Sequence, residues 1–267
     1  MVRVNTSPVI RRAHPFAVGI LGGMGPAAGA DFVRLFVDAC TELMQAAGAP
    51  VTDQAYPEHW LAQVPVPDRS QALRQTTDHL RSRPLEAMRQ VAVRLSALGV
   101  RTVAIACNTA HAWHAPLQAS FPGLEVIDGL REVACELSRR GVREAGLLAT
   151  EGTYSSGIYQ AALEAVGIRC HVPQPAEQQV LMDGIYRGVK AGDMALARRN
   201  FSDVARALAE RHALATLIMG CTEIPLALNG APPLAGLQLI DPARAAARVL
   251  ALRAYGVEES QAIWPAG

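Results

Sequence analysis

Short apolar runs alternate along this chain with longer amphipathic stretches in which apolar residues recur at the helical period. The short runs predict strands over residues 16–21, 61–64, 102–106, 145–149, 168–172 and 216–219. The longer stretches predict helices over residues 26 to about 47, 85–98, 158 to about 166, 177–189 and 194–211. This alternation predicts an α/β fold built on mostly parallel sheets.

Two of the predicted strands lead into a cysteine in the same context. Cys107 ends the run VAIAC and is followed by Asn-Thr, and Cys221 ends the run LIMGC and is followed by Thr-Glu. The repeated pattern indicates a diverged duplication with two similar lobes. Functional loops lie at the carboxyl ends of parallel strands, so both thiols are expected to face a cleft. A single buried cysteine is usually inert packing, but two in equivalent contexts favour acid–base chemistry.

The other three cysteines, Cys40, Cys135 and Cys170, lie in predicted helices or a short strand, where packing explains them. The total of five is odd, the spacing is wide and no CxxC occurs. This arrangement is neither a disulfide framework nor a metal site, and it favours a reducing, cytoplasmic compartment. His111 and His114 share one face of a predicted helix, where packing is a better explanation than metal binding.

Two loops are candidates for binding an anion. The glycine-rich turn GILGGMGP at 19–26 presents free N–H groups and includes a GxGxxA match to the dinucleotide fingerprint. No convincing strand precedes Asp53, where the fingerprint expects an acidic residue, so a small carboxylate fits better than a dinucleotide. Arg69 follows two prolines, which predict a stiff, non-helical loop with Arg69 at its tip. There it could grip a carboxylate, although an ordinary surface arginine fits the local sequence equally well.

Length, charge and hydropathy limit the classes of binding partner that this chain can have. The 267 residues suit one large or two small domains. Lys and Arg total 25 and Asp and Glu 24, so no basic field is available for nucleic acid or a membrane surface. No apolar run reaches the roughly 18 residues of a membrane span. Residues 1–15 lack the apolar core of a secretory signal and are predicted to be a disordered tail. Lys190 is the only lysine.

Together, these residues resemble the aspartate/glutamate racemase superfamily, and most closely its branch of aspartate racemases, which are cofactor-independent. The matching motifs are GILGGMGP at 19–26, VPDRS at 66–70, ACNTAH at 106–111, LLATEGTYSSGIYQ at 147–160, GVKAG at 188–192 and MGCTEIPL at 219–226. The sequence departs from the branch before PDR, at Gln63-Val64, and an added stretch near 77–83 lengthens the loop after Arg69.

The resemblance implies two pseudo-symmetric α/β lobes, each a mostly parallel sheet flanked by helices, with the active site in the cleft between them. Lobe one would comprise residues 16–123 and 234–267, and lobe two residues 124–233. It also implies a homodimer, no cofactor, no metal, and a small amino acid as the binding partner.

The resemblance also assigns roles. Cys107 and Cys221 would be the acid–base pair, one a thiolate and the other a thiol. Residues implied in binding the substrate, an acidic amino acid with aspartate ahead of glutamate, are Met24, Arg69, Asn108, Thr109, Thr153, Lys190, Thr222 and Glu223. Arg69 and Lys190 would supply positive charge, and Glu223 would tune the neighbouring thiol.

Other functions stay open. Maleate isomerases and hydantoin racemases reuse the two cysteines on other substrates, whereas a decarboxylase of this superfamily would keep only one. A non-catalytic binder of acidic amino acids would show no proton exchange. A redox dithiol would form a reversible disulfide matched to its activity.

Overall fold

The computed structural model describes residues 10, 15–229, 234 and 236–258. Most of the predicted tail, residues 1–9 and 11–14, lies outside the described residues, as do residues 259–267 of the predicted first lobe. In the described part of the chain, no helix is long and apolar enough to cross a lipid bilayer.

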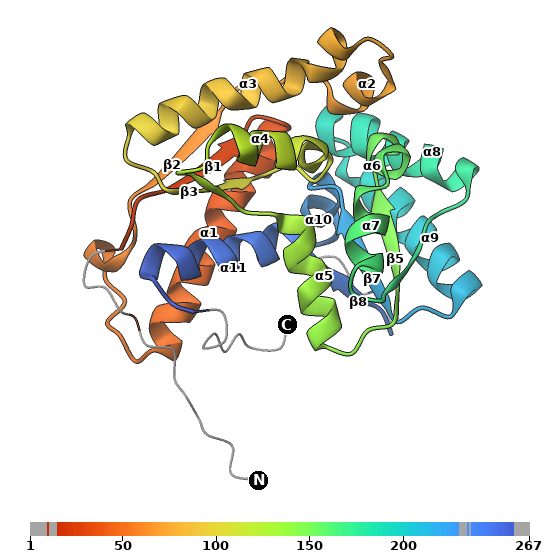
Figure 1. The fold of residues 1–267 in the computed structure, drawn as a ribbon. Coiled ribbons are helices and arrows are strands. Elements are labelled where there is room, and N and C mark those ends of the chain that lie inside the picture. The colour runs from red at the N-terminus through yellow and green to blue at the C-terminus, as the bar shows by residue number, and fades with distance from the viewer. Residues whose placement is uncertain (1–9, 11–14, 230–233, 235, 259–267) are drawn as a thin grey trace.

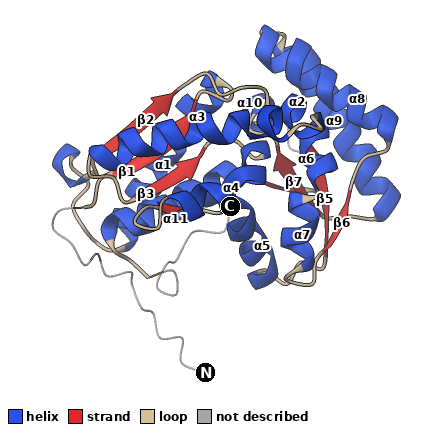
Figure 2. Cartoon of the chain, turned by 45° about the horizontal axis from the view of Figure 1, so that its top comes forward, coloured by secondary structure: helices blue, strands red, loops and turns tan. Residues whose placement is uncertain are grey.

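Two four-stranded sheets, each entirely parallel, form the centre of the molecule (Figures 1 and 2). The first has the order β2-β1-β3-β4 and the second the order β6-β5-β7-β8, so the order is the same once the numbering is shifted by four. This identity confirms the predicted α/β fold of two similar lobes. The strands are β1 (Val18–Gly22), β2 (His59–Gln63), β3 (Thr102–Ile105), β4 (Glu125–Val126), β5 (Glu144–Ala149), β6 (Arg169–His171), β7 (Thr216–Gly220) and β8 (Gln238–Ile240).

Helices flank both sheets. They are α1 (Pro26–Ala46), α2 (Arg69–Arg74), α3 (Asp78–Ala97), α4 (His114–Ser120), α5 (Gly129–Arg139), α6 (Glu151–Ser156), α7 (Ile158–Glu164), α8 (Pro175–Asp183), α9 (Met194–His212), α10 (Glu223–Leu228) and α11 (Pro242–Tyr255). Short tight turns of helix cover Asp53–Ala55, Thr109–Trp113 and Val189–Ala191, and a wider π-type turn covers Gly184–Gly188.

The helix α1 shows why the apolar period specifies these elements. Pro26 occupies its first turn, where a missing N–H costs nothing. Its buried side chains, including Phe32, Phe36 and Leu43, recur every three or four residues and face the first sheet. The helix α11, near the other end of the chain, packs along α1 and buries Tyr255 in the same core.

The first lobe is therefore discontinuous, but its boundaries differ from those predicted. β4 pairs with β3, so residues 125–126 belong to the first sheet, whereas the predicted second lobe begins at 124. β8 pairs with β7, so residues 238–240 belong to the second sheet, and the return to the first lobe comes with α11 and not at 234. Strands this short carry too few residues for a recognisable alternation.

The loop after β2 also differs from its prediction. Arg69 does not lie at a loop tip but begins α2. Pro67 restricts only its own φ and the preceding Val66, so a helix can begin two residues after it. The Asp68 carboxylate accepts the backbone N–H of Gln71 at 2.8 Å and caps the helix. The added stretch near 77–83 is the exposed first part of α3, whose polar sequence hides the helix from an apolar count.

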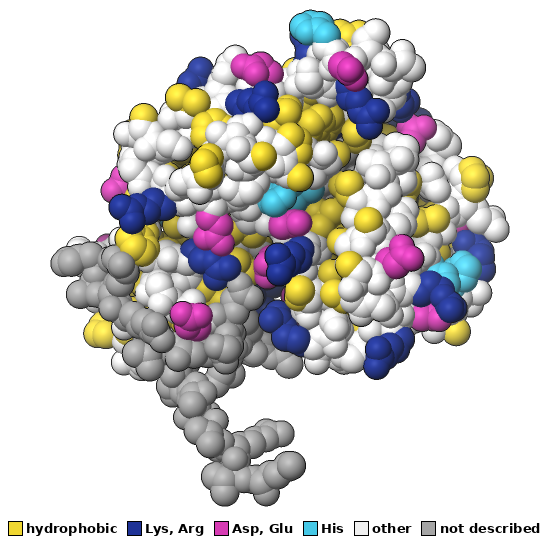
Figure 3. Space-filling view, in the orientation of Figure 1, with side chains coloured by type: hydrophobic (Ala, Val, Ile, Leu, Met, Phe, Trp, Pro, Cys, Tyr) yellow, Lys and Arg dark blue, Asp and Glu magenta, His cyan; other side chains and the backbone are white. Residues whose placement is uncertain are grey.

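Basic and acidic side chains are interspersed over the face shown in Figure 3, with no large area of one sign. This agrees with the even charge balance of the sequence.

Candidate active site

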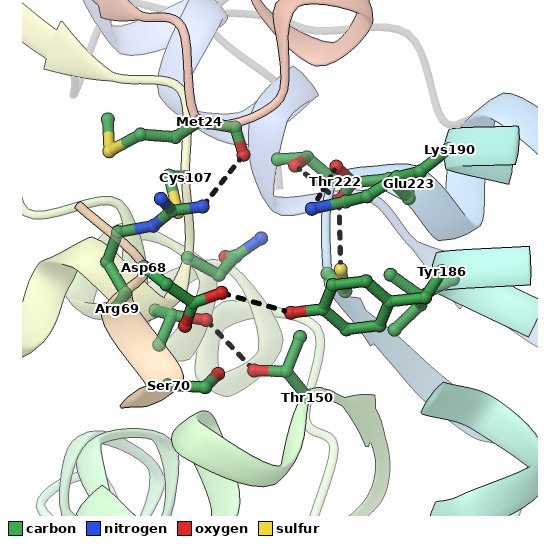
Figure 4. Close-up of a pocket in the computed structure, with 14 residues that line it drawn as sticks. Met24, Asp68, Arg69, Ser70, Cys107, Thr150, Tyr186, Lys190, Thr222 and Glu223 are labelled. Carbon is green, nitrogen blue, oxygen red and sulfur yellow. Dashed lines mark hydrogen bonds and ion pairs between the residues drawn. The ribbon is translucent and has the colours of Figure 1, made fainter. Parts of the chain in front are cut away.

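The carboxyl ends of both sheets meet at one pocket between the lobes (Figure 4). The first lobe contributes residues from the β1–α1 turn, the β2–α2 loop and the end of β3, and the second lobe contributes the ends of β5 and β7 and the segment 185–190. The pocket is lined by Met24, Asp68, Arg69, Ser70, Cys107, Asn108, Thr109, Thr150, Ile185, Tyr186, Lys190, Cys221, Thr222 and Glu223.

Nearly all the side chains singled out in the sequence meet in this pocket. Thr153 is the exception: it is fully buried behind the wall, and its hydroxyl lies 2.9 Å from that of Thr109 and 3.1 Å from that of Thr150. Sequence analysis missed five lining residues, namely Asp68, Ser70, Thr150, Ile185 and Tyr186. The sequence did offer signals for them: Asp68 and Ser70 flank Arg69, and Thr150 lies near Thr153. Ile185 and Tyr186 lie about one helical turn before Lys190.

Cys221 lies beside a carboxylate. Its Sγ–H donates to Glu223 Oε2 at 3.0 Å, and the hydroxyl of Thr222 donates to the same oxygen at 3.2 Å. Lys190 Nζ lies 3.6 Å from Glu223 Oε1. Burial, followed by the charge of Glu223, raises the pKa of Cys221 well above its ordinary value. This thiol is therefore held in its protonated form.

Cys107 lies beside a guanidinium instead. Burial raises the pKa of its thiol, and the positive charge of Arg69 acts in the opposite direction. Equivalent strands thus present two buried thiols on which the largest charge effects have opposite signs, that of Arg69 on Cys107 and that of Glu223 on Cys221. Of the two, Cys107 is the easier one to ionise.

Arg69 turns inward and joins two loops. Its Nη1 donates to the carbonyls of Val66 at 3.1 Å and Pro67 at 3.2 Å, and its Nη2 donates to the carbonyl of Met24 at 3.2 Å. Its Nε is buried and has no hydrogen-bond partner among the described residues. Arg69 is therefore not a solvated surface residue, and it retains a donor next to the pocket.

The glycine-rich turn packs closely against its neighbours. Gly23 has a φ of +82°, and a Cβ there would lie 2.3 Å from the backbone of Val64. A Cβ on Gly25 would lie 3.0 Å from Glu223 Oε1 in the other lobe. The turn is thus packed against the β2–α2 loop and against Glu223 of the opposite lobe, and these close approaches explain why glycine occupies both positions.

Several side-chain contacts join the two lobes in and beside the pocket. Tyr186 donates its hydroxyl to Asp68 Oδ2 at 3.4 Å, and Lys190 Nζ lies 4.8 Å from the centre of the Tyr186 ring. Nearby, Arg74 of α2 forms an ion pair with Glu151 of α6 at 2.8 Å. These contacts bring the two cationic side chains of the pocket, Arg69 and Lys190, to opposite walls.

Behind Cys107, the imidazole of His111 uses both nitrogens within the protein. Nδ1 lies 3.0 Å from the carbonyl of Cys107, and Nε2 accepts the backbone N–H of Gly129 at 3.1 Å. The ring is therefore neutral with its proton on Nδ1, and burial lowers its pKa. Among the described residues, no group of three or more His, Cys, Asp or Glu side chains could hold a metal ion.

Fold and site together define a two-lobed α/β protein with one thiol from each lobe in a shared polar pocket. The model of the Asp/Glu/hydantoin racemase family matches residues 21–250, and the chain belongs to this family. This result confirms the resemblance seen in the motifs.

Individual relatives of this chain are also named as amino-acid racemases. Aspartate racemase from Picrophilus torridus superimposes with a TM-score of 0.72 at 27% identity, covering 91% of this chain and 95% of that one. The broad-specificity amino-acid racemase RacX of Bacillus subtilis is 32% identical over 152 residues, which are 56% of this chain and 61% of RacX. A glutamate racemase of Lysinibacillus sphaericus is 31% identical over 145 residues, 51% of each chain. The matches thus span half to three-fifths of these two relatives.

Proposed function

We propose that this protein is a cofactor-independent amino-acid racemase that interconverts the L- and D-forms of an acidic amino acid, with aspartate preferred over glutamate. The observation that carries the proposal is the pair of thiols at the ends of the equivalent strands β3 and β7, both facing one pocket. Racemisation needs a base on one face of Cα and an acid on the other, which two facing thiols supply.

The charged neighbours of the thiols support a defined starting state. Cys107, beside Arg69, acts as the thiolate and removes the Cα proton, and its Sγ becomes a thiol. The electron pair of the broken C–H bond is delocalised into the substrate carboxylate. Cys221, which donates to Glu223, then transfers its proton to the opposite face and becomes the thiolate. The reverse reaction, or proton exchange with solvent, restores the starting state.

Hydrogen-bond donors around the pocket would stabilise the carbanion. Asn108, Thr109 and Thr222 lie directly after the two cysteines and reach the same pocket, so they are placed to bind the α-carboxylate and amino group. Thr153 would act one step behind them, by orienting the hydroxyl of Thr109.

The two cationic side chains support an acidic substrate. Arg69 and Lys190 stand on opposite walls of the pocket, and a dicarboxylate offers one carboxylate to each. A hydantoin ring has no free carboxylate to match them. Maleate, which has two, remains the second candidate substrate on the same observation.

Deuterium exchange with chiral analysis tests the proposal. The purified protein is incubated in deuterated water with aspartate, glutamate, asparagine, alanine, maleate and a hydantoin. We expect the opposite enantiomer of aspartate to form with one deuterium at Cα, without added cofactor. Fumarate formed from maleate, with no deuterated aspartate, would replace the racemase by an isomerase. Aspartate that binds but exchanges no proton would leave only a binding protein.

We also propose that the protein is a homodimer. Light scattering coupled to size-exclusion chromatography distinguishes the 28.4 kDa monomer from a species of twice that mass.

A further inference from the structure

Tyr159 reaches from the second lobe to a pocket residue of the first. It lies on α7, is fully buried, and donates its hydroxyl to Oδ1 of Asn108 at 2.6 Å. The ring packs with Leu163 and Val133 in the core of the second lobe, so the position of the hydroxyl is fixed by that core. Tyr159 does not itself line the pocket.

The contact determines which end of the Asn108 amide is free. Asn108 is 5% exposed and lines the pocket, and its Nδ2 has no hydrogen-bond partner among the described residues. The distance of 2.6 Å is typical of O–H···O and short for N–H···O, which agrees with the carbonyl end facing Tyr159. Because burial raises the pKa of the Tyr159 hydroxyl well above its ordinary value, that hydroxyl stays a donor.

An amide that presents its NH2 group can donate to a carboxylate, whereas a flipped amide would present a carbonyl oxygen and repel it. A flip would also leave the buried hydroxyl of Tyr159 facing an NH2 group, with no acceptor for its proton. The hydrogen bond from Tyr159 therefore selects one of two nearly isosteric orientations.

We propose that Tyr159 is a positioning residue, which holds the Asn108 amide so that its NH2 group receives a substrate carboxylate. A residue of the second lobe thereby sets the orientation of Asn108, a substrate-binding residue of the first lobe. This orientation requires that the two lobes are docked. The carboxylate part of this inference rests on the proposed racemase function, but the orientation of the amide does not.

Nuclear magnetic resonance tests the orientation without reference to activity. The chain has four asparagines, so 15N-asparagine labelling gives few side-chain NH2 signals, and Asn108→Ala identifies the one required. We expect this signal to be rigid in the wild type and mobile in Tyr159→Phe. The matched control is Tyr255→Phe, which removes a buried hydroxyl that donates to the carbonyl of Ala55 at 2.9 Å in the other core. An Asn108 signal equally rigid in Tyr159→Phe overturns the proposal.

Steady-state kinetics test the consequence. Tyr159→Phe should raise KM for aspartate about tenfold with a much smaller change in kcat, because leaving a buried polar group unpaired is costly. In the Asn108→Ala background, Tyr159→Phe should change KM less than about twofold, since a residue acting through Asn108 is then silent. Asn108→Asp keeps the acceptor for Tyr159 but presents an oxygen to the pocket, so it should raise KM at least as much.

The outcomes separate the two claims. Independent, multiplicative effects of the two substitutions, or an unchanged KM in Tyr159→Phe, overturn the positioning role in an active enzyme. If the wild type racemises nothing while the Asn108 signal still becomes mobile in Tyr159→Phe, the proposed function fails and the control of the amide by Tyr159 stands.

Discussion

Replacing Glu223 by Gln should make the thiol of Cys221 easier to ionise. The carboxylate is 4% exposed, accepts the thiol proton at 3.0 Å and lies 3.6 Å from Lys190. Glutamine has nearly the same volume and can still accept a hydrogen bond, but it carries no charge. The substitution therefore tests the charge of Glu223 while leaving the packing in place.

The size of the effect can be worked from the hydrogen bond. A bond to a charged acceptor contributes about 1.5–3 kcal/mol and a neutral one about 0.5–1.5 kcal/mol, so the thiol loses about 1–1.5 kcal/mol of preference for its protonated form. That difference corresponds to about a tenfold shift of the Cys221 equilibrium toward the thiolate, so the pKa of Cys221 falls. Removing the repulsion between carboxylate and thiolate, and releasing Lys190 from its ion pair, both act in the same direction.

Alkylation with a neutral reagent, read peptide by peptide by mass spectrometry, measures the change. At a fixed pH near 8, Glu223→Gln should increase the labelling rate of Cys221 about tenfold relative to Cys135 on α5. Cys135 serves as the internal reference because the charge of Glu223 also acts on Cys107. The matched control is Glu151→Gln, which removes a carboxylate that pairs with Arg74 of the other lobe and does not line the pocket. An unchanged or lower ratio in Glu223→Gln, or an equal rise in both variants, would refute the reasoning.

Other predictions concern the catalytic pair, the substrate charge and the fold. Cys107→Ser or Cys221→Ser should each slow racemisation by about 10²–10⁴-fold, whereas Cys135→Ser on α5 should not. Chiral chromatography measures the rates, and a serine variant of either pocket cysteine that keeps more than about a tenth of wild-type turnover would remove that cysteine from the mechanism. Lys190→Met should lower kcat/KM for aspartate about ten- to a hundredfold. Lys190→Arg should not fully restore it, because an ammonium is a compact charge and a guanidinium is a broad one. An equal loss of kcat/KM for alanine would contradict the acidic-substrate proposal. Burial lowers the pKa of His111 below its ordinary 6.5, so the unfolded chain takes up a proton more readily and stability should fall as the pH drops below about 6.5. Urea unfolding at pH 7.5 and 5.5 should show a smaller loss for His111→Gln than for the wild type, and equal losses would exclude His111 as the cause.

The part of the site that lies at the end of a strong strand could be predicted from the sequence. β3 and β7 are short, fully buried apolar runs, and their ends carry Cys107 and Cys221 to the same edge wherever the fold is two parallel sheets. The polar residues directly after each cysteine come with them. The local sequence is sufficient to predict these residues, because the end of each strand can be recognised and the next few residues must then lie at the pocket.

Contacts between distant segments could not be predicted in this way. Whether Arg69 points to solvent or inward depends on the carbonyl of Met24, 45 positions away, and on the helix that begins at Arg69 itself. The partner of Asn108 lies 51 positions further on. Tyr159 falls within a predicted helix and a family motif, but neither indicates that its hydroxyl reaches Asn108. Such pairs are fixed by how the lobes dock, and the local sequence is compatible with several outcomes.

The duplication explains both the likeness of the two thiols and the difference between them. Two copies of one strand order bring equivalent cysteines to one pocket, but identical surroundings would give two thiols that ionise equally, and two adjacent thiolates repel. A base and an acid must coexist, so the copies have to differ where the charge is set. In this chain the two copies differ in the charged residue that reaches each thiol: Arg69 reaches Cys107 from the first residue of α2, and Glu223 reaches Cys221 from the first turn of α10. Exchanging the two charges, by replacing Arg69 with an acid and Glu223 with a base, should therefore invert which thiol alkylates faster, provided that the lobes still dock.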